Sequence, residues 1–101
     1  MEKRPIVFIG ALNSEIKYLV EMSGEQYVEN HDIRAQINKL KQLNAFIPSE
    51  DKLRLYASTI NSWEVETRYN DKFVALIEDI NEIRIIADEL IKYCESLVRI
   101  E

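Results

Sequence analysis

The chain has 101 residues, of which 47% are hydrophobic and 31% charged, and its formal net charge is -5. This composition excludes a disordered chain, and the acidic balance argues against binding of duplex nucleic acid, which requires a basic face. A single cysteine excludes an internal disulfide and any Cys-x-x-Cys metal or redox motif, and it suits a cytoplasmic protein. We therefore expect one globular domain over residues 1–101.

Glycine and proline are scarce, with two of each, and the hydrophobic spacing predicts four helices. The first helix is expected over Pro5–Met22, and Gly24 is expected to stop it, because glycine readily adopts the left-handed conformation after a helix. The apolar run at its start, Pro5–Leu12, is far shorter than the roughly 20 residues that cross a bilayer. No membrane partner is therefore expected.

The second helix is expected over His31–Asn44, where Asn30 or Asp32 can accept hydrogen bonds from the first unpaired amides. A short turn over Ala45–Pro48 follows, and we expect its two large apolar residues, Phe46 and Ile47, to be buried.

Ser49 is expected to cap the third helix, which ends near Arg68. Its apolar stripe recurs at alternating steps of three and four residues, as one face of a helix requires. The stripe consists of Leu53, Tyr56, Ile60, Trp63 and Thr67.

The fourth helix is expected to be capped by Asn70 or Asp71 and to run to Val98, which makes it about 40 Å long. Several large apolar residues fall outside its main stripe, namely Leu76, Ile85, Ile86 and Ile91. A short neighbouring helix cannot cover so long a partner, and another chain is the simplest cover for the extra apolar surface. We therefore expect an all-α, four-helix up-and-down bundle that associates with itself or with a partner.

No group of residues forms a catalytic or metal site by spacing alone. A zinc site requires about four Cys or His ligands, and this chain has only His31 and Cys94. Its two glycines cannot form a phosphate-binding loop, and Cys94 falls on the apolar stripe, which favours a place in the core. No metal or resident cofactor is therefore expected.

Four side chains have both a structural and a functional interpretation. His31 is the only histidine, and it either fixes a turn or serves in acid-base chemistry near neutral pH. Either Arg68 pairs with Glu64 one turn earlier and Tyr69 covers the end of the bundle, or the two side chains together bind a phosphate or a partner's carboxylate. Trp63 lies on the apolar stripe, which favours the core.

Two short motifs resemble the HEPN family (higher eukaryotes and prokaryotes nucleotide-binding). Asn-His-Asp-Ile opens the second helix at position 30, and Trp-x-x-Glu-x-Arg-Tyr-Asn-Asp joins the last two helices from position 63. They resemble the family's His-Asp-Leu-like turn and its Ala-Arg-Tyr-Pro-Asp-like stretch. Ile33 stands for the leucine, Thr67 for the alanine and Asn70 for the proline, and the similarity extends from about Leu12 to Leu97.

The resemblance implies a small helical module that dimerises. Such modules are often encoded beside a minimal nucleotidyltransferase and form a two-component, toxin-antitoxin-like complex with it. By carry-over, the residues expected to line a groove for a ligand or partner are His31, Asp32, Arg68 and Tyr69, with Trp63 beside them.

Two departures from the family limit what the resemblance implies. The family ordinarily begins with an additional long helix, and we expect this chain to begin at the family's second helix. Many HEPN ribonucleases carry an arginine followed four to six residues later by a histidine, and this sequence has no such pair. RNA cleavage by that mechanism is therefore not expected. The alternative is a nucleotide-binding or RNA-cleaving protein that uses Arg68 and Tyr69.

Overall fold

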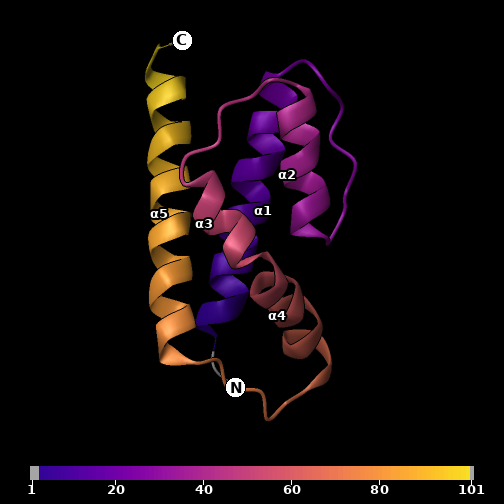
Figure 1. The fold of residues 1–101 in the computed structure, drawn as a ribbon, viewed down its shortest axis with the longest axis vertical. Helices are drawn as coiled ribbons and strands as arrows, with labels where there is room; N and C mark the ends of the chain where they lie inside the picture. Colours follow the sequence, from indigo (N-terminus) through magenta and orange to yellow (C-terminus); the bar gives the residue numbers. More distant parts are fainter. Residues whose placement is uncertain (1–2, 101) are drawn as a thin grey trace.

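The computed structural model describes residues 3–100, which form five helices and contain no strand. The helices are α1 (Arg4–Met22), α2 (Ile33–Gln42), α3 (Glu50–Leu55), α4 (Ala57–Tyr69) and α5 (Ile77–Ile100) (Figure 1). The prediction of an all-α fold is confirmed. The expected third helix is divided into α3 and α4, and the expected fourth helix begins later along the chain, at Ile77.

The helices do not alternate in direction as an up-and-down bundle requires. In Figure 1, α1, α2 and α5 run in the same direction, while α3 and α4 run the opposite way. The connection over residues 23–32 makes this possible because it returns along the side of α2 before that helix begins. Gln36, which is buried, holds this connection by donating hydrogen bonds to the Asn30 carbonyl at 2.7 Å and to Tyr27 Oη at 3.1 Å.

The ends of α1 and α2 follow from local chemistry. Gly24 has a φ of +84°, and the Glu25 amide donates to the Val20 carbonyl, so glycine stops α1 as predicted. Asn44 does the same for α2 with a φ of +57°. Asp32 caps the start of α2 with its side chain, which confirms one of the two residues proposed for that role.

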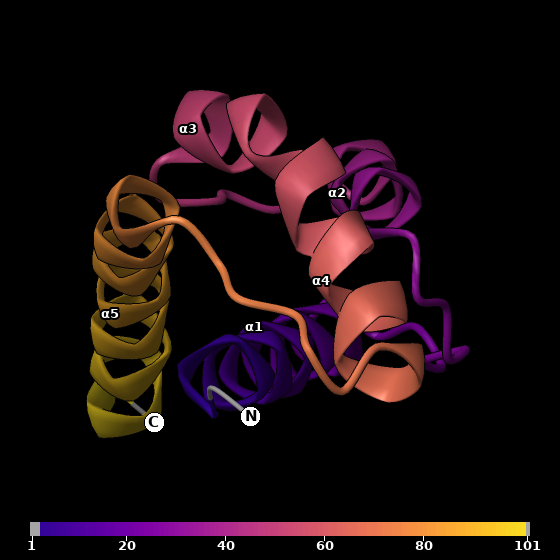
Figure 2. The same cartoon turned by 90° about the horizontal axis from the view of Figure 1, so that it is seen from below.

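The chain changes direction sharply at Tyr56, between α3 and α4 (Figure 2). Helical hydrogen bonds continue on both sides, because the Tyr56 amide donates to Lys52 and the Tyr56 carbonyl accepts from Ile60. The bend has a packing reason: α3 contacts α5, whereas α4 contacts α1. One straight helix would not reach both neighbours, and the hydrophobic stripe alone did not reveal the bend.

The prediction that Asn70 or Asp71 caps the last helix is wrong. Asn70 instead forms a turn in which its Oδ1 accepts a hydrogen bond from the Lys72 amide at 3.1 Å, an interaction that competes with helix formation. The chain then crosses one end of the molecule to α5, with Phe73 half-buried and Ala75 buried.

The turn before α3 also differs from the expectation. Ser49 adopts a left-handed backbone with a φ of +56° and makes no side-chain cap. Its hydroxyl is hydrogen-bonded to Glu89 of α5 instead. Ile47 is buried as expected, but Phe46 is exposed and packs edge-on against Tyr93.

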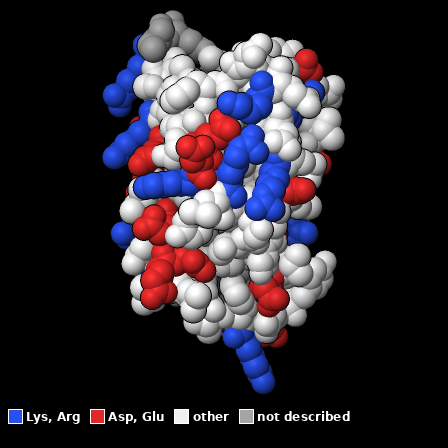
Figure 3. All heavy atoms as spheres, viewed as in Figure 1, with Lys and Arg blue, Asp and Glu red and all other residues white. Residues whose placement is uncertain are grey.

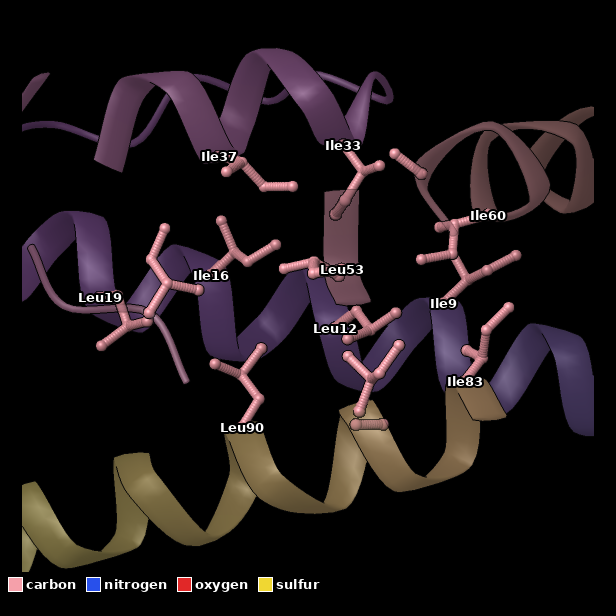
Figure 4. Packing of buried hydrophobic residues seen from close by; sticks show 14 of the residues in the cluster. Ile9, Leu12, Ile16, Leu19, Ile33, Ile37, Leu53, Ile60, Ile83 and Leu90 are labelled. Atoms are coloured by element: carbon pink, nitrogen blue, oxygen red, sulfur yellow. The ribbon is translucent and has the colours of Figure 1, made fainter. Parts of the chain in front are cut away.

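The core lies between all five helices (Figure 4). Along α1, α2 and α5 the buried residues recur at the three- and four-residue steps of one helix face, and they include Leu12, Ile37 and Leu90. Ile86 is buried in this core and is not part of a surplus surface, whereas Leu76 and Ile85 are exposed. Within residues 3–100, no helix combines the length and the hydropathy that a membrane span needs.

Candidate functional site

Side-chain hydrogen bonds join the turn that begins α2 to the middle of α4. Asp32 Oδ1 accepts a hydrogen bond from the Arg34 amide at 3.0 Å, which caps α2. Asn61 of α4 donates from Nδ2 to the same oxygen at 3.1 Å, and its Oδ1 accepts from the Ile33 amide at 3.0 Å. Asn61 therefore completes the cap from a second helix and fixes the His31–Asp32 turn against α4.

Glu64, one turn further along α4, is the centre of the polar cluster. Its Oε1 accepts a hydrogen bond from Asn13 Nδ2 of α1 at 3.3 Å and lies 3.4 Å from His31 Nδ1. Its Oε2 lies 3.4 Å from Arg68 Nη2, and that nitrogen is also 3.4 Å from His31 Nε2. The two ring nitrogens of His31 therefore face different groups, Nδ1 the Glu64 carboxylate and Nε2 the Arg68 guanidinium.

The Glu64 carboxylate lies inside the cluster, and the His31 and Arg68 side chains lie at its surface. The Glu64 side chain is 12% exposed, whereas those of His31 and Arg68 are 48% and 49% exposed. Glu29, which is more exposed still, lies 3.8 Å from His31 Nε2. The Arg68 guanidinium has five N–H donors, so donors remain available to solvent or to an anion while it is paired with Glu64.

The five residues expected to line a groove lie in three different environments. His31, Asp32 and Arg68 come together around α4, and the expected pairing of Arg68 with Glu64 is present. Tyr69 is 80% exposed at the end of α4. Trp63 is 2% exposed and belongs to the core, because it lies on the side of α4 that faces the bundle, so its indole does not line the cluster.

Sequence reasoning missed two members of the cluster, Asn13 and Asn61. Both are uncharged side chains within helices that were interpreted by their apolar stripes. For Asn61, a signal was available: it lies three residues before Glu64 and seven before Arg68, which places all three on one face of a helix. Asn13 carries no such signal, because its role depends on how α1 packs against α4.

A surface hollow of about 390 Å³ borders the cluster on the side of α1. It is lined by Asn13, Ser14, Lys17, Tyr27, Glu29, Asn30 and His31. The Lys17 ammonium lies 5.9 Å from the centre of the Tyr27 ring, a distance suited to a cation–π contact. The lining is polar and of mixed charge, which favours a polar ligand or a partner side chain over an apolar one.

Cys94 does not supply a nucleophile. Its side chain is buried, and its sulfur lies 3.9 Å from the Glu15 carbonyl oxygen. Burial, followed by the interaction with Glu15, raises the pKa of the Cys94 thiol to about 12, so it stays protonated at neutral pH. Among the described residues, no group of three His, Cys, Asp or Glu side chains is placed to hold a metal ion.

Comparison with known proteins identifies no relative: no family model, no curated protein and no solved structure matches the chain. The contacts around Glu64 and the distribution of exposed side chains are therefore the basis for a functional conclusion. The cluster contains a half-exposed guanidinium and imidazole held by one carboxylate, which can bind an acidic group.

Proposed function

We propose that this chain is a small HEPN-like interaction module. It associates with itself and with a minimal nucleotidyltransferase subunit in a two-component, toxin-antitoxin-like system of the cytoplasm. Self-association is supported by the number of large apolar side chains that are exposed to solvent, such as Leu55 at 75% and Val74 at 76% exposure. Isolated exposed apolar residues are ordinary, but neighbouring ones mark contact surfaces.

The meeting of the two motifs supports the HEPN-like character of the module. His31 and Asp32 belong to the first motif, and Arg68 belongs to the second, 36 positions after Asp32 (68 minus 32). Glu64 and Asn61 join them into one cluster at the surface. Two motifs that come together in this way are suited to one shared site.

Self-association is tested by the mass of the protein in solution. Light scattering after size-exclusion chromatography should give a mass that rises from 11.9 kDa toward twice that value as the loaded concentration reaches the high micromolar range. A mass that stays at 11.9 kDa under these conditions would count against the proposal.

The proposal of a nucleotidyltransferase partner rests on the resemblance to the HEPN family and requires its own test. Its reading frame should neighbour the frame for this chain and encode a Gly-Ser motif followed by paired aspartates. Co-expression of the two chains, with a tag on one, should recover both in a fixed ratio. Substitution of Arg68 by alanine should reduce recovery if the polar cluster contributes to the contact.

The second candidate function is nucleotide or RNA binding, in which Arg68 contacts a phosphate and Tyr69 stacks on a base. The adjacent, exposed guanidinium and phenol at the end of α4 favour it. Calorimetric titration with ATP and with short RNAs tests it, and Arg68→Ala should abolish the heat of binding. Arg54→Ala is the matched control, because Arg54 also pairs with a glutamate one turn earlier, Glu50 at 2.9 Å. No heat with the unaltered protein removes this candidate.

A further inference from the structure

The outward face of α4 is a continuous uncharged stripe. Ser58, Ser62, Val65 and Tyr69 follow one another at steps of four, three and four residues, so they lie on one side of the helix. All four are exposed, and Leu55 at the end of α3 is exposed just before them. The stripe contains no charged residue in a chain of which 31% is charged.

The segment between α4 and α5 extends this surface. Val74, Leu76 and Ile77 are each more than 60% exposed. A hollow of about 340 Å³ separates this segment from α4; its lining includes Ser58, Ser62, Val74 and Leu76, and among the described residues Asp79 is the one charged member of that lining. Figure 2 looks at this end of the molecule and shows α4 beside the chain that leads from it to α5.

We propose that the uncharged α4 face binds the same face of a second copy of this chain. The inference rests on the self-association proposed above and assigns it to one surface. Charge favours this partner: each copy has a net charge of -5, so two copies approach most easily where neither presents a charge. In Figure 3 the Lys and Arg side chains lie over the middle of the face and along the α5 edge, while the lower right region, where α4 lies, is mostly uncharged with a few acidic side chains.

A two-fold axis near Ser62 makes the stripe complementary to itself. With the two α4 helices antiparallel, Ser58 of one copy lies opposite Val65 of the other, so a small side chain meets a larger one. The serines allow close approach of the helices, and the hollow beside them accommodates the valine. Such a contact closes after two copies, because the same patch is used twice.

The size of the surface indicates a weak dimer. The 13 residues of α4 make a face about 20 Å long and about 10 Å wide. With the adjoining segment, the contact remains below the roughly 800 Å² per partner that stable complexes bury. We therefore expect a dimer that dissociates in the micromolar range.

Two valines allow a matched test, since Val65 on α4 and Val98 on α5 are both 56% exposed. Sedimentation velocity of the full chain should show that Val65→Asp raises the dimer dissociation constant ~100-fold or more, because two unpaired carboxylates enter the contact. Val98→Asp should change the dissociation constant by less than about threefold, as expected for a residue outside the contact. Circular dichroism melts of both variants check that each remains folded.

A second variant gives an independent result if Val65→Asp fails to fold. In a Cys94→Ala background, Ser62→Cys should form a disulfide-linked dimer on mild oxidation, and Ser14→Cys on α1 should not. Suppose that the unaltered chain dimerises. The α4 assignment is then overturned if no Ser62→Cys crosslink forms and a folded Val65→Asp variant keeps the dissociation constant of the unaltered chain. A monomeric unaltered chain at high micromolar concentration would instead remove the proposed self-association, and the inference with it.

Discussion

Replacing Glu64 by alanine is expected to lower the free energy of unfolding by about 2 kcal/mol. The substitution removes the acceptor for Asn13 and the counter-charge for Arg68, and it takes away the carboxylate beside His31. Leaving a buried charge without its partner costs about 3–5 kcal/mol, whereas breaking an exposed ion pair costs at most about 1 kcal/mol.

The geometry places Glu64 between these limits. The carboxylate is only 12% exposed, which raises the cost of losing its partners. Arg68 and His31 are about half exposed, however, and water can solvate both after the substitution. The contacts, at 3.3–3.4 Å, are also long for charge-assisted hydrogen bonds. Glu64→Gln retains the side-chain volume and should cost about half as much, roughly 1 kcal/mol.

Guanidinium unfolding followed by circular dichroism measures this loss, and the melting temperature should fall by about 8–16 °C for Glu64→Ala. Glu66→Ala is the control, because Glu66 lies on the same helix and its carboxylate accepts a hydrogen bond from exposed Asn70, at 2.8 Å. It should cost less than about 0.5 kcal/mol. Equal losses for Glu64→Ala and Glu66→Ala would refute the role of Glu64 as the centre of the cluster.

Three further predictions concern the surrounding structure. Gln36→Leu leaves the Asn30 carbonyl without its donor and should cost about 1–3 kcal/mol, with faster amide exchange over residues 27–32; unchanged exchange there would contradict the role of Gln36. Asp32→Ala should cost about 1 kcal/mol or more in a urea titration, because it removes the cap of α2 and the partner of Asn61, whereas Asp32→Asn should lose less. The pKa of the Cys94 thiol, raised from 9.0 to about 12, means that the folded chain holds this proton more tightly than the unfolded chain. That contribution to stability is complete below about pH 9 and is lost as the pH rises toward 12, so unfolding titrations should show an alkaline decline that Cys94→Ala lacks.

The parts of the fold that depend on residues close together in the sequence were predictable from the sequence. The apolar stripes of α1, α2 and α5, the glycine that stops α1 and the Asp32 cap all follow from spacing or local hydrogen bonding. The bend at Tyr56 was not predictable in this way, because it serves packing between distant helices. The late start of α5 was missed because Asn70 was expected to cap a helix, whereas its side chain accepts from the Lys72 amide in a turn. The direction of α2 depends likewise on Gln36, whose partners lie in the preceding connection.

The same distinction applies to the polar cluster. The Arg68–Glu64 pair spans one helical turn and was anticipated as the structural interpretation of Arg68. The contact of His31 with Glu64 joins positions 33 apart (64 minus 31), and only the packing of α2 against α4 brings them together. Trp63 illustrates the opposite case, because the stripe that placed it in the core was a better guide than the motif that grouped it with Arg68.

Sedimentation equilibrium of the unaltered chain from low to high micromolar concentration tests most directly whether its exposed apolar side chains require a partner. A mass that rises with concentration from 11.9 kDa toward twice that value is the expected result. A constant mass of 11.9 kDa over the whole range would contradict it.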